Sequence, residues 1–244
     1  MSREQFTLVL ESARMVTPRV RELTLVREGG QTLPFVPGQF ITMHMPFDGK
    51  TLLRNYSIAT IPGTTDAIQI AATFIEGGRA THHLFEMQAG DRVDTTGPFG
   101  RFVLRDDPPT HYILVGTGTG VTPYRSMLPE LGHRFEDGNF STVLLLGVRG
   151  PDELLYGQDF LDFAEQHPEF HFQARYSRIM PETPAPHERR GYVQDALNEL
   201  DLDPGTSIVY LCGNPNMIDA AAQQLHTAGF PTPKVRREKY VSSN

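Results

Sequence analysis

The sequence predicts a protein of two domains, an antiparallel β-barrel followed by an α/β domain with a parallel sheet. Its 244 residues suffice for two domains of roughly 100–150 residues each. In the first half, apolar and polar residues alternate along short runs, as they do in half-buried strands. In the second half, apolar strand segments alternate with helical segments. The net charge also changes, from +1 over residues 1–105 to −8 over residues 106–244. We place the boundary at Asp106-Asp107-Pro108-Pro109, which gives domains of residues 1–106 and 107–244.

The first half contains short β-type runs separated by Gly, Pro and Asp clusters, at a spacing typical of a barrel or sandwich. One short helix is expected after Gly77-Gly78, over residues 80–87. The predicted strands are residues 6–10, 20–26, 40–45, 56–59, 67–74 and 92–95.

The second half alternates strands and helices, which predicts a parallel sheet with right-handed crossovers. The expected strands, 112–115, 143–147, 170–176 and 208–212, are mostly continuous apolar runs of the kind that a buried sheet requires. Helices are expected from about Pro123 and over residues 153–166, 193–200 and 215–227. Ligands of such sheets bind beyond the carboxyl ends of the strands, so functional residues are sought there.

The composition excludes several classes of protein. A single cysteine, Cys212, rules out a disulfide framework and a cysteine-ligated iron–sulfur cluster within these residues. The net charge of −7 disfavours nucleic-acid binding, and no apolar run approaches the roughly 18 residues of a membrane span. The first ten residues do not resemble a signal peptide. We therefore expect a cytoplasmic monomer without membrane or nucleic-acid partners.

A glycine-rich segment, residues 116–123 (GTGTGVTP), joins the first buried strand of the second half to a helix. Glycines allow a ligand to approach the backbone closely, and the following helix N-terminus favours a pyrophosphate. Pro123 suits the first helical turn but breaks the G-x-G-x-x-G pattern of dinucleotide-binding loops. An ordinary tight turn is the alternative interpretation.

Two further segments follow predicted strands of the same sheet. Cys212 and Gly213 precede a helix, although a buried structural cysteine is the alternative. Ser177 and Arg178 offer a hydroxyl and a guanidinium, which can bind a phosphate dianion. Arg149, Arg189 and Arg190 are additional cations in this acidic half, where solvated surface arginines are the alternative.

Two segments of the first half carry similar chemistry. Arg54-Asn55-Tyr56-Ser57 combines a charge for a phosphate, an aromatic face for a flat ring and a small donor. Gly78-Arg79-Ala80-Thr81 opens the only helix expected there, at a position that favours an anion. Each segment alone is a weak signal, because a tyrosine in a barrel more often packs in the core.

Together these segments resemble the ferredoxin–NADP reductase family of flavoproteins, over nearly the whole chain and in the same order. Arg54–Ser57 resembles its R-x-Y-S motif, Gly78–Thr81 its G-x-x-S/T motif and residues 116–123 its nicotinamide-cofactor loop. Residues 212–217 resemble C-G-x-x-x-M, and Glu238-Lys239-Tyr240 the acidic–x–aromatic end. Two departures are that residues 241–244 continue past the aromatic residue, and that GPFGRF, residues 97–102, is more similar to oxygenase reductases.

The resemblance implies an FAD-binding barrel and an NAD(P)-binding α/β domain, with hydride transfer between nicotinamide and flavin. In the barrel it implies that Arg54 binds the FAD pyrophosphate, Tyr56 stacks on the isoalloxazine, Ser57 lies near its N5, and Gly78, Ala80 and Thr81 hold phosphates, with Asn55 beside them. In the second domain it implies cofactor binding by Thr117, Gly118, Thr119, Gly120, Pro123, Arg149, Ser177, Arg178, Arg189, Cys212, Gly213 and Tyr240. Ser57, Cys212, Glu238 and Tyr240 are the candidate catalytic residues, and either Tyr240 or the tail that follows it covers the flavin.

The expected cofactors are FAD and NADPH. Ser177-Arg178 favours the 2′-phosphate of NADPH, because a free ribose hydroxyl is usually bound by Asp or Glu and none follows Tyr176 closely. The expected partner is a separate ferredoxin or flavodoxin. The alternatives are an NAD(P)H-dependent reductase component of an oxygenase system and a non-catalytic flavin or nucleotide sensor.

Overall fold

A computed structural model of the chain describes residues 5–105, 111–138 and 140–240. They form two compact units. The first comprises the residues up to Leu104 together with Thr122–Met127, and the second comprises Arg105–Val121 and the residues from Leu128 onward. The boundary that the sequence predicts, between residues 106 and 107, lies outside the described residues and stays a prediction.

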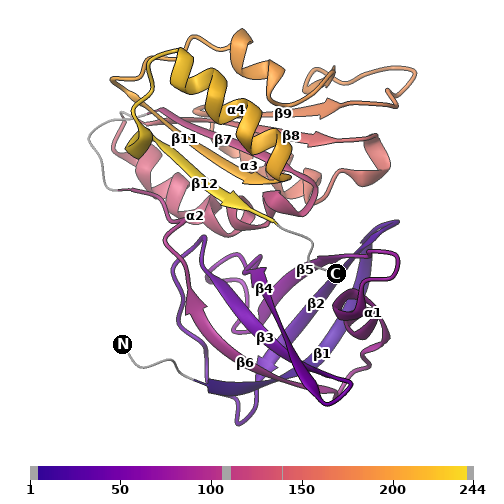
Figure 1. The fold of residues 1–244 in the computed structure, drawn as a ribbon. Coiled ribbons are helices and arrows are strands. Elements are labelled where there is room, and N and C mark those ends of the chain that lie inside the picture. The colour runs from indigo at the N-terminus through magenta and orange to yellow at the C-terminus, as the bar shows by residue number, and fades with distance from the viewer. Residues whose placement is uncertain (1–4, 106–110, 139, 241–244) are drawn as a thin grey trace. The chain divides into compact units, whose positions relative to one another are not determined.

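The first unit is built on a six-stranded antiparallel sheet of order β4-β3-β6-β1-β2-β5 (Figure 1). Its strands are β1 (Gln5–Thr17), β2 (Val20–Arg27), β3 (Phe40–Phe47), β4 (Lys50–Ser57), β5 (Ile68–Thr73) and β6 (Arg92–Phe99). The segment after β4 reaches β5, where Ala59 N donates to Gln69 O at 2.7 Å. This contact curls the sheet into the predicted barrel.

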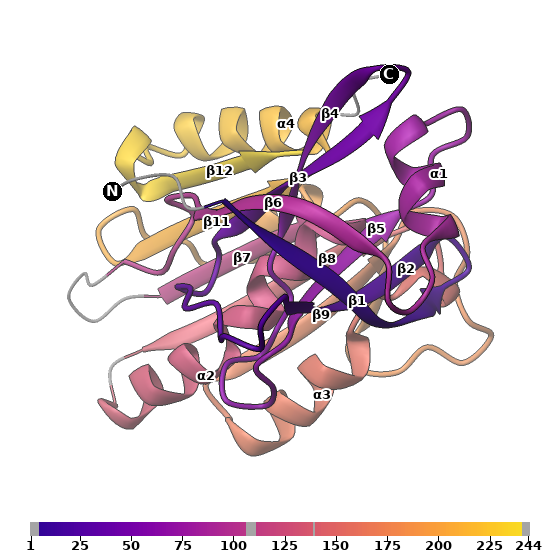
Figure 2. The same ribbon diagram turned by 90° about the horizontal axis from the view of Figure 1, so that it is seen from below.

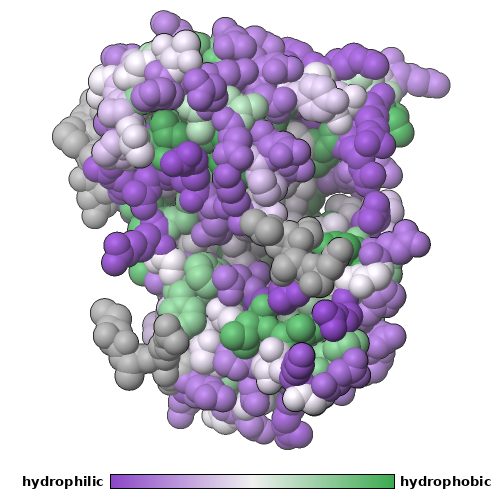
Figure 3. Space-filling model, in the orientation of Figure 1, coloured by the Kyte–Doolittle hydropathy of each residue, from purple (hydrophilic) through white to green (hydrophobic). Residues whose placement is uncertain are grey.

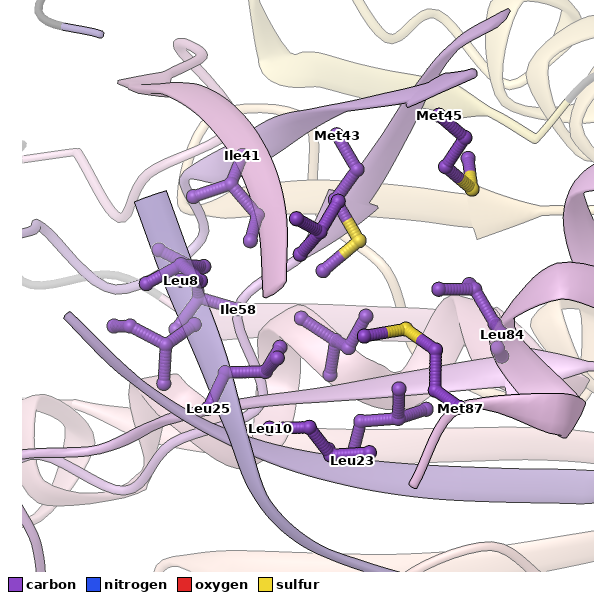
Figure 4. Close-up of a cluster of buried hydrophobic side chains, with 14 of the residues drawn as sticks. Leu8, Leu10, Leu23, Leu25, Ile41, Met43, Met45, Ile58, Leu84 and Met87 are labelled. Atoms are coloured by element: carbon purple, nitrogen blue, oxygen red, sulfur yellow. The ribbon is translucent and has the colours of Figure 1, made fainter. Parts of the chain in front are cut away.

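The core of the barrel follows from the alternation along its strands, which turns every second side chain inward. Leu8, Leu10, Leu23, Leu25, Ile41 and Met43 are all buried and converge in Figure 4. Helix α1 (Arg79–Glu86) adds Leu84 to the same core, followed by Met87. The helix lies beside β2 and β5 (Figures 1 and 2).

The second unit contains a six-stranded parallel sheet of order β10-β9-β8-β7-β11-β12. Its strands are β7 (His111–Thr117), β8 (Ser141–Val148), β9 (Phe170–Tyr176), β10 (Glu188–Arg190), β11 (Ser207–Gly213) and β12 (Val235–Lys239). The strand order reverses between β7 and β11, because the chain winds outward to β10 before it returns to the other side of β7. Sheets of this kind bind ligands in the crevice at such a reversal.

Helices cover both faces of the parallel sheet. Helix α4 (Pro215–Thr227) packs on the face formed by Ile113, Val115, Val209 and Leu211. Helix α2 (Thr122–Glu136) contacts the opposite face, where the Arg134 guanidinium lies over the Tyr112 ring. Helix α3 (Gly157–Gln166) continues that layer through packing between the rings of Phe160 and Phe172.

Several expected elements differ from the structure, and β1 and β6, for example, continue beyond the expected residues 10 and 95 to Thr17 and Phe99. Residues 193–200 form a short 3-10 segment (Asp195–Glu199) instead of an α-helix, because Asp and Asn favour helix formation weakly over so short a segment. The helix expected from residue 153 begins at Gly157, because Tyr156 adopts a left-handed conformation with φ of 58°. Strand β4 begins six residues before the expected Tyr56.

The strands β10 and β12 were not expected from the sequence. Both are edge strands, and their sequences, ERR and VRREK, carry the charge that discourages pairing with other chains.

On the face seen in Figure 3, apolar side chains form only small patches among polar ones. None of the helices in the described part of the chain has the length and apolar character needed to cross a membrane.

Candidate functional site

Strand β4 presents the first motif at an edge of the barrel sheet. Alternation places Arg54 and Tyr56 on one face of the strand and Asn55 on the other. The Asn55 side chain is bound to the neighbouring strand, since Thr42 Oγ1 donates to Asn55 Oδ1 at 2.8 Å. Arg54 and Tyr56 therefore share a surface on which a charged group and a flat ring could bind together.

Tyr56 is a partly buried residue that packs against the barrel core. Burial raises the pKa of its hydroxyl to about 12, an effect that the Arg54 charge opposes. The tyrosine therefore stays neutral at physiological pH. Ser57, which follows, is buried at the end of the strand.

The first turn of α1 is the second element of the barrel's candidate site. Gly78 precedes the helix without a side-chain cap, and the first turn contains no acidic residue. The Thr81 hydroxyl donates to Gly78 O at 2.9 Å, so it holds the preceding loop instead of facing outward. A Cβ on Gly78 would lie 2.9 Å from Thr81 Oγ1, so this curled loop favours glycine. The backbone N–H groups at the start of α1 are suited to an anion.

In the second unit, most of the predicted segments lie at or just after the carboxyl end of a strand, whereas Arg189 lies within β10. Gly118 follows β7, Arg149 follows β8, Ser177 follows β9 and Tyr240 follows β12, while Cys212 and Gly213 end β11. Because the strands are parallel and in register, these segments share one edge of the sheet. The edge includes the point between β7 and β11 where the strand order reverses.

The glycine-rich loop and the end of β11 meet closely at this point. A Cβ on Gly120 would lie 2.3 Å from the Cys212 carbonyl oxygen, so only glycine fits there. Gly118 has a φ of 52° and no neighbouring atom within 4 Å of its Cβ position, so its backbone is open to a ligand. Thr119 lies between them, and Pro123 occupies the first turn of α2.

Cys212, Glu238 and Tyr240 form a cluster beside this loop. Cys212 pairs with Glu238 in the register of β11 and β12, and the Tyr240 N–H donates to the Gly213 carbonyl at 2.9 Å. Burial, and secondarily the Glu238 carboxylate, raises the pKa of the Cys212 thiol, while a hydrogen bond with Tyr240 opposes the rise. The thiol is therefore protonated at neutral pH, which fits a packing group better than a nucleophile.

The candidate phosphate-binding arginines differ in their contacts. Arg178 is exposed, and its backbone N–H donates to the Arg149 carbonyl at 3.0 Å. The Arg149 guanidinium is held in an ion pair with Glu153. Arg189 is exposed on edge strand β10, two residues along from His187. Ser177 and Arg178 thus adjoin Arg149, whereas Arg189 belongs to the neighbouring strand.

Comparisons with known proteins agree with this arrangement. Residues 7–104 match the family described as Oxidoreductase FAD-binding domain, and residues 114–223 match Oxidoreductase NAD-binding domain. The chain is 30% identical to Ferredoxin–NADP reductase B of Sorangium cellulosum over 97% of its own length and 98% of that protein. The chain belongs to the ferredoxin–NADP reductase family. It is an oxidoreductase of that family with an FAD-binding barrel and an NAD(P)-binding α/β domain.

Other members of the family are reductase components of oxygenases. The chain is 31% identical to the propane 2-monooxygenase reductase component of Rhodococcus jostii, covering 85% of the chain and 56% of that protein. The crystal structure of the Amycolatopsis cytochrome P450 reductase GcoB superposes with a TM-score of 0.87 at 28% identity, over 99% of this chain and 71% of that one. A ferredoxin NADP+ reductase from Neisseria gonorrhoeae shares the fold, with a TM-score of 0.82 at 19% identity and coverage of 98% and 99%.

The residues present fit both cofactors. The uncapped first turn of α1, together with Arg54, offers donors for a pyrophosphate, and the partly buried Tyr56 offers a face for a flat ring. In the second unit, the open backbone at Gly118 offers donors for the pyrophosphate of a dinucleotide. The structure thus groups Arg54 and Tyr56 on one strand face, and Cys212, Glu238 and Tyr240 in one cluster.

Sequence reasoning missed several residues that shape these sites. Asn214 caps α4, as its Oδ1 accepts the Asn216 N–H at 2.8 Å, and the Asn-Pro pair was the available signal. Glu153, which binds Arg149, gave no comparable signal. Arg21 on β2 binds the end of α1, which lies far along the sequence from it, so only the fold brings the two together. Residues 241–244, the expected alternative cover of the flavin, lie outside the described residues.

Proposed function

We propose that this protein is a ferredoxin or flavodoxin NADP reductase that uses NADPH. FAD, when bound, accepts a hydride from the nicotinamide and exchanges single electrons with a carrier. The observation that carries the proposal is the full-length similarity to the Sorangium reductase, which leaves almost none of that protein uncovered. These 244 residues contain one cysteine, too few for an iron–sulfur cluster within them, so the proposed electron acceptor is a carrier that lies outside these residues.

The proposed roles follow from the placement of the residues. Arg54 and the start of α1 bind the FAD pyrophosphate, and Tyr56 supports the isoalloxazine. Gly118, Thr119 and Gly120 bind the pyrophosphate of NADPH through backbone N–H groups. Cys212, Glu238 and Tyr240 line the place of the nicotinamide, where the protonated Cys212 excludes water and the Tyr240 ring holds the position until the nicotinamide enters. Ser57 is the proposed hydrogen-bonding partner near the flavin N5.

Double-mixing stopped flow tests this function. The FAD-loaded protein is mixed anaerobically with NADPH, and the loss of flavin absorbance is followed. The reduced protein is then mixed with oxidised ferredoxin or flavodoxin, which should reoxidise it rapidly. If NADPH bleaches the flavin but neither carrier reoxidises it, the family activity stands and the proposed carrier class is wrong.

We further propose that Arg178 determines the preference for NADPH. It is exposed beside Arg149, and no side-chain partner of Arg178 is present among the described residues. Arg178→Ala should lower the ratio of kcat/KM for NADPH over NADH about ten-fold or more, as expected for the loss of a charge-assisted hydrogen bond. Lys234→Ala, which removes one charge before β12 at the opposite edge of the sheet, is the control. An unchanged ratio in Arg178→Ala would remove Arg178 from this role.

A second candidate function is the reductase of an oxygenase system. Three observations favour it: the 31% identity to the propane 2-monooxygenase component, the similarity to the P450 reductase GcoB, and the GPFGRF segment. The chain spans little more than half of the propane 2-monooxygenase component, so the activity of that whole protein carries over only as a proposal. Faster reoxidation of the reduced flavin by an oxygenase or its ferredoxin would favour this candidate.

A further inference from the structure

We propose that Thr117 is a positioning residue, whose hydroxyl fixes the turn at residues 212–214 instead of binding the cofactor phosphates. The sequence predicted Thr117 as a direct ligand within the glycine-rich loop. In the structure, the Asn214 N–H donates to Thr117 Oγ1 at 2.9 Å. The hydroxyl therefore joins the end of β7 to the start of α4, at the point where the strand order of the parallel sheet reverses.

The backbone around this hydrogen bond leaves little space. Gly213 has a φ of 118°, and a Cβ there would lie 2.5 Å from Thr117 Oγ1 and 2.7 Å from Thr117 O. On the other side, a Cβ on Gly120 would lie 2.7 Å from Gly213 Cα. The glycine-rich loop and the turn at residues 212–214 are thus interlocked through two glycines and one hydroxyl.

Three contacts converge on this turn. Besides Thr117, the Tyr240 N–H donates to the Gly213 carbonyl, and the Asn214 side chain caps α4. Cys212 is the first residue of this turn and is fully buried. A change in the turn therefore moves Cys212, Tyr240 and the start of α4 together, so Thr117 acts on the nicotinamide position through its neighbours.

The two possible roles of Thr117 predict different kinetics. A direct phosphate ligand stabilises bound NADPH throughout the reaction, so its loss raises KM and leaves kcat unchanged. A positioning residue keeps the reacting groups aligned, so its loss lowers kcat more than it raises KM. This kinetic test rests on the proposed function. A measurement of how readily the Cys212 thiol becomes accessible does not.

The single cysteine of the chain provides the second measurement. Cys212 is labelled in the FAD-loaded protein with dithiobis(nitrobenzoate), a thiol reagent that reaches it only when the turn opens. Thr117→Val keeps the shape of the side chain but removes the acceptor, and should speed labelling about five-fold, within the range for one ordinary hydrogen bond. Thr117→Ser keeps the hydroxyl and should label as slowly as the parent.

Thr142→Val is the matched control, because the Thr142 hydroxyl is buried in the same sheet and has no hydrogen-bond partner among the residues that the structure describes. The proposal holds if Thr117→Val raises the rate of labelling and lowers kcat, while Thr117→Ser and Thr142→Val do neither. It is overturned if labelling is unchanged in Thr117→Val, or if Thr117→Ser labels as fast as Thr117→Val. A raised KM for NADPH with unchanged kcat and labelling would make Thr117 a direct ligand. Faster labelling of Thr117→Val than of the parent, together with no NADPH oxidation by the parent, would contradict the proposed function and leave the positioning role intact.

Discussion

At the scale of residues, the cluster of Cys212, Glu238 and Tyr240 depends on backbone positions that tolerate only glycine. The strand-end positions of Gly120 and Gly213 could be predicted from the sequence, because buried strands and the residues that follow them are evident there. The contacts of these glycines could not, since Gly120 meets Cys212 and Gly213 meets Thr117 across about a hundred residues of chain. The ion pair of Arg149 with Glu153 is local, since it joins residues four apart, but it forms around a short 3-10 turn that the sequence pattern did not indicate.

Gly213→Ala tests the crowding at this position. The alanine would combine an unfavourable φ of 118° with a methyl group 2.5 Å from Thr117 Oγ1, so we expect a loss of about 2 kcal/mol or more in unfolding free energy. Gly191→Ala is the control, because Gly191 has a φ of 124° but no atom within 4 Å of its Cβ position. Denaturant unfolding measures both variants, and equal losses would show that backbone strain alone accounts for the effect.

At the scale of elements, the central strands could be predicted from their apolar runs, whereas the edge strands β10 and β12 could not. Their charged sequences lack any hydrophobic pattern, and only pairing with β9 and β11 makes them strands. Helix α1 was predicted from its flanking glycines, but its orientation depends on β2. Arg21 Nη1 donates to Leu84 O at 2.8 Å and Arg21 Nη2 to Met87 O at 2.9 Å.

Arg21→Ala tests whether this contact supports flavin binding. The variant leaves the last carbonyls of α1 without their charged donor, so the helix should shift and its first turn should bind FAD several-fold more weakly. Arg21→Lys should recover part of the affinity, since one ammonium reaches a carbonyl but does not reproduce both contacts of the guanidinium. Fluorescence titration with FAD measures the affinity. A loss of thermal stability with unchanged FAD affinity would limit Arg21 to a structural role.

At the scale of the whole molecule, the barrel and the parallel sheet were both predicted, because alternating and continuous apolar runs differ in kind. The boundary between the two units was harder to predict from the sequence. The Arg105 N–H donates to Tyr210 Oη at 3.1 Å and the Tyr112 hydroxyl donates to Arg105 O at 2.9 Å, so Arg105 belongs to the second unit. These contacts precede the Pro108-Pro109 pair that suggested the boundary.

The buried tyrosines of the second unit predict a loss of stability at alkaline pH. Burial raises the pKa of Tyr210 to about 12, whereas an unfolded tyrosine titrates near pH 10. Above pH 10 the unfolded state loses its proton first, so the unfolding free energy should fall by about 1.4 kcal/mol per pH unit for this group until pH 12. Denaturant unfolding between pH 8 and 11.5 measures the fall. Tyr210→Phe should show a shallower slope above pH 10, and an equal slope would contradict this origin.

In the proposed function, a bound nicotinamide would pass its hydride directly to the flavin. Single-turnover reduction by NADPH carrying deuterium at C4 tests this most directly, because the bond broken in the transfer is the labelled one. We predict that flavin bleaching saturates with NADPH concentration and that deuterium on the transferred face slows it, while deuterium on the other face has little effect. Bleaching at the same rate with either labelled face, or no bleaching of a protein that holds FAD, would contradict the claim.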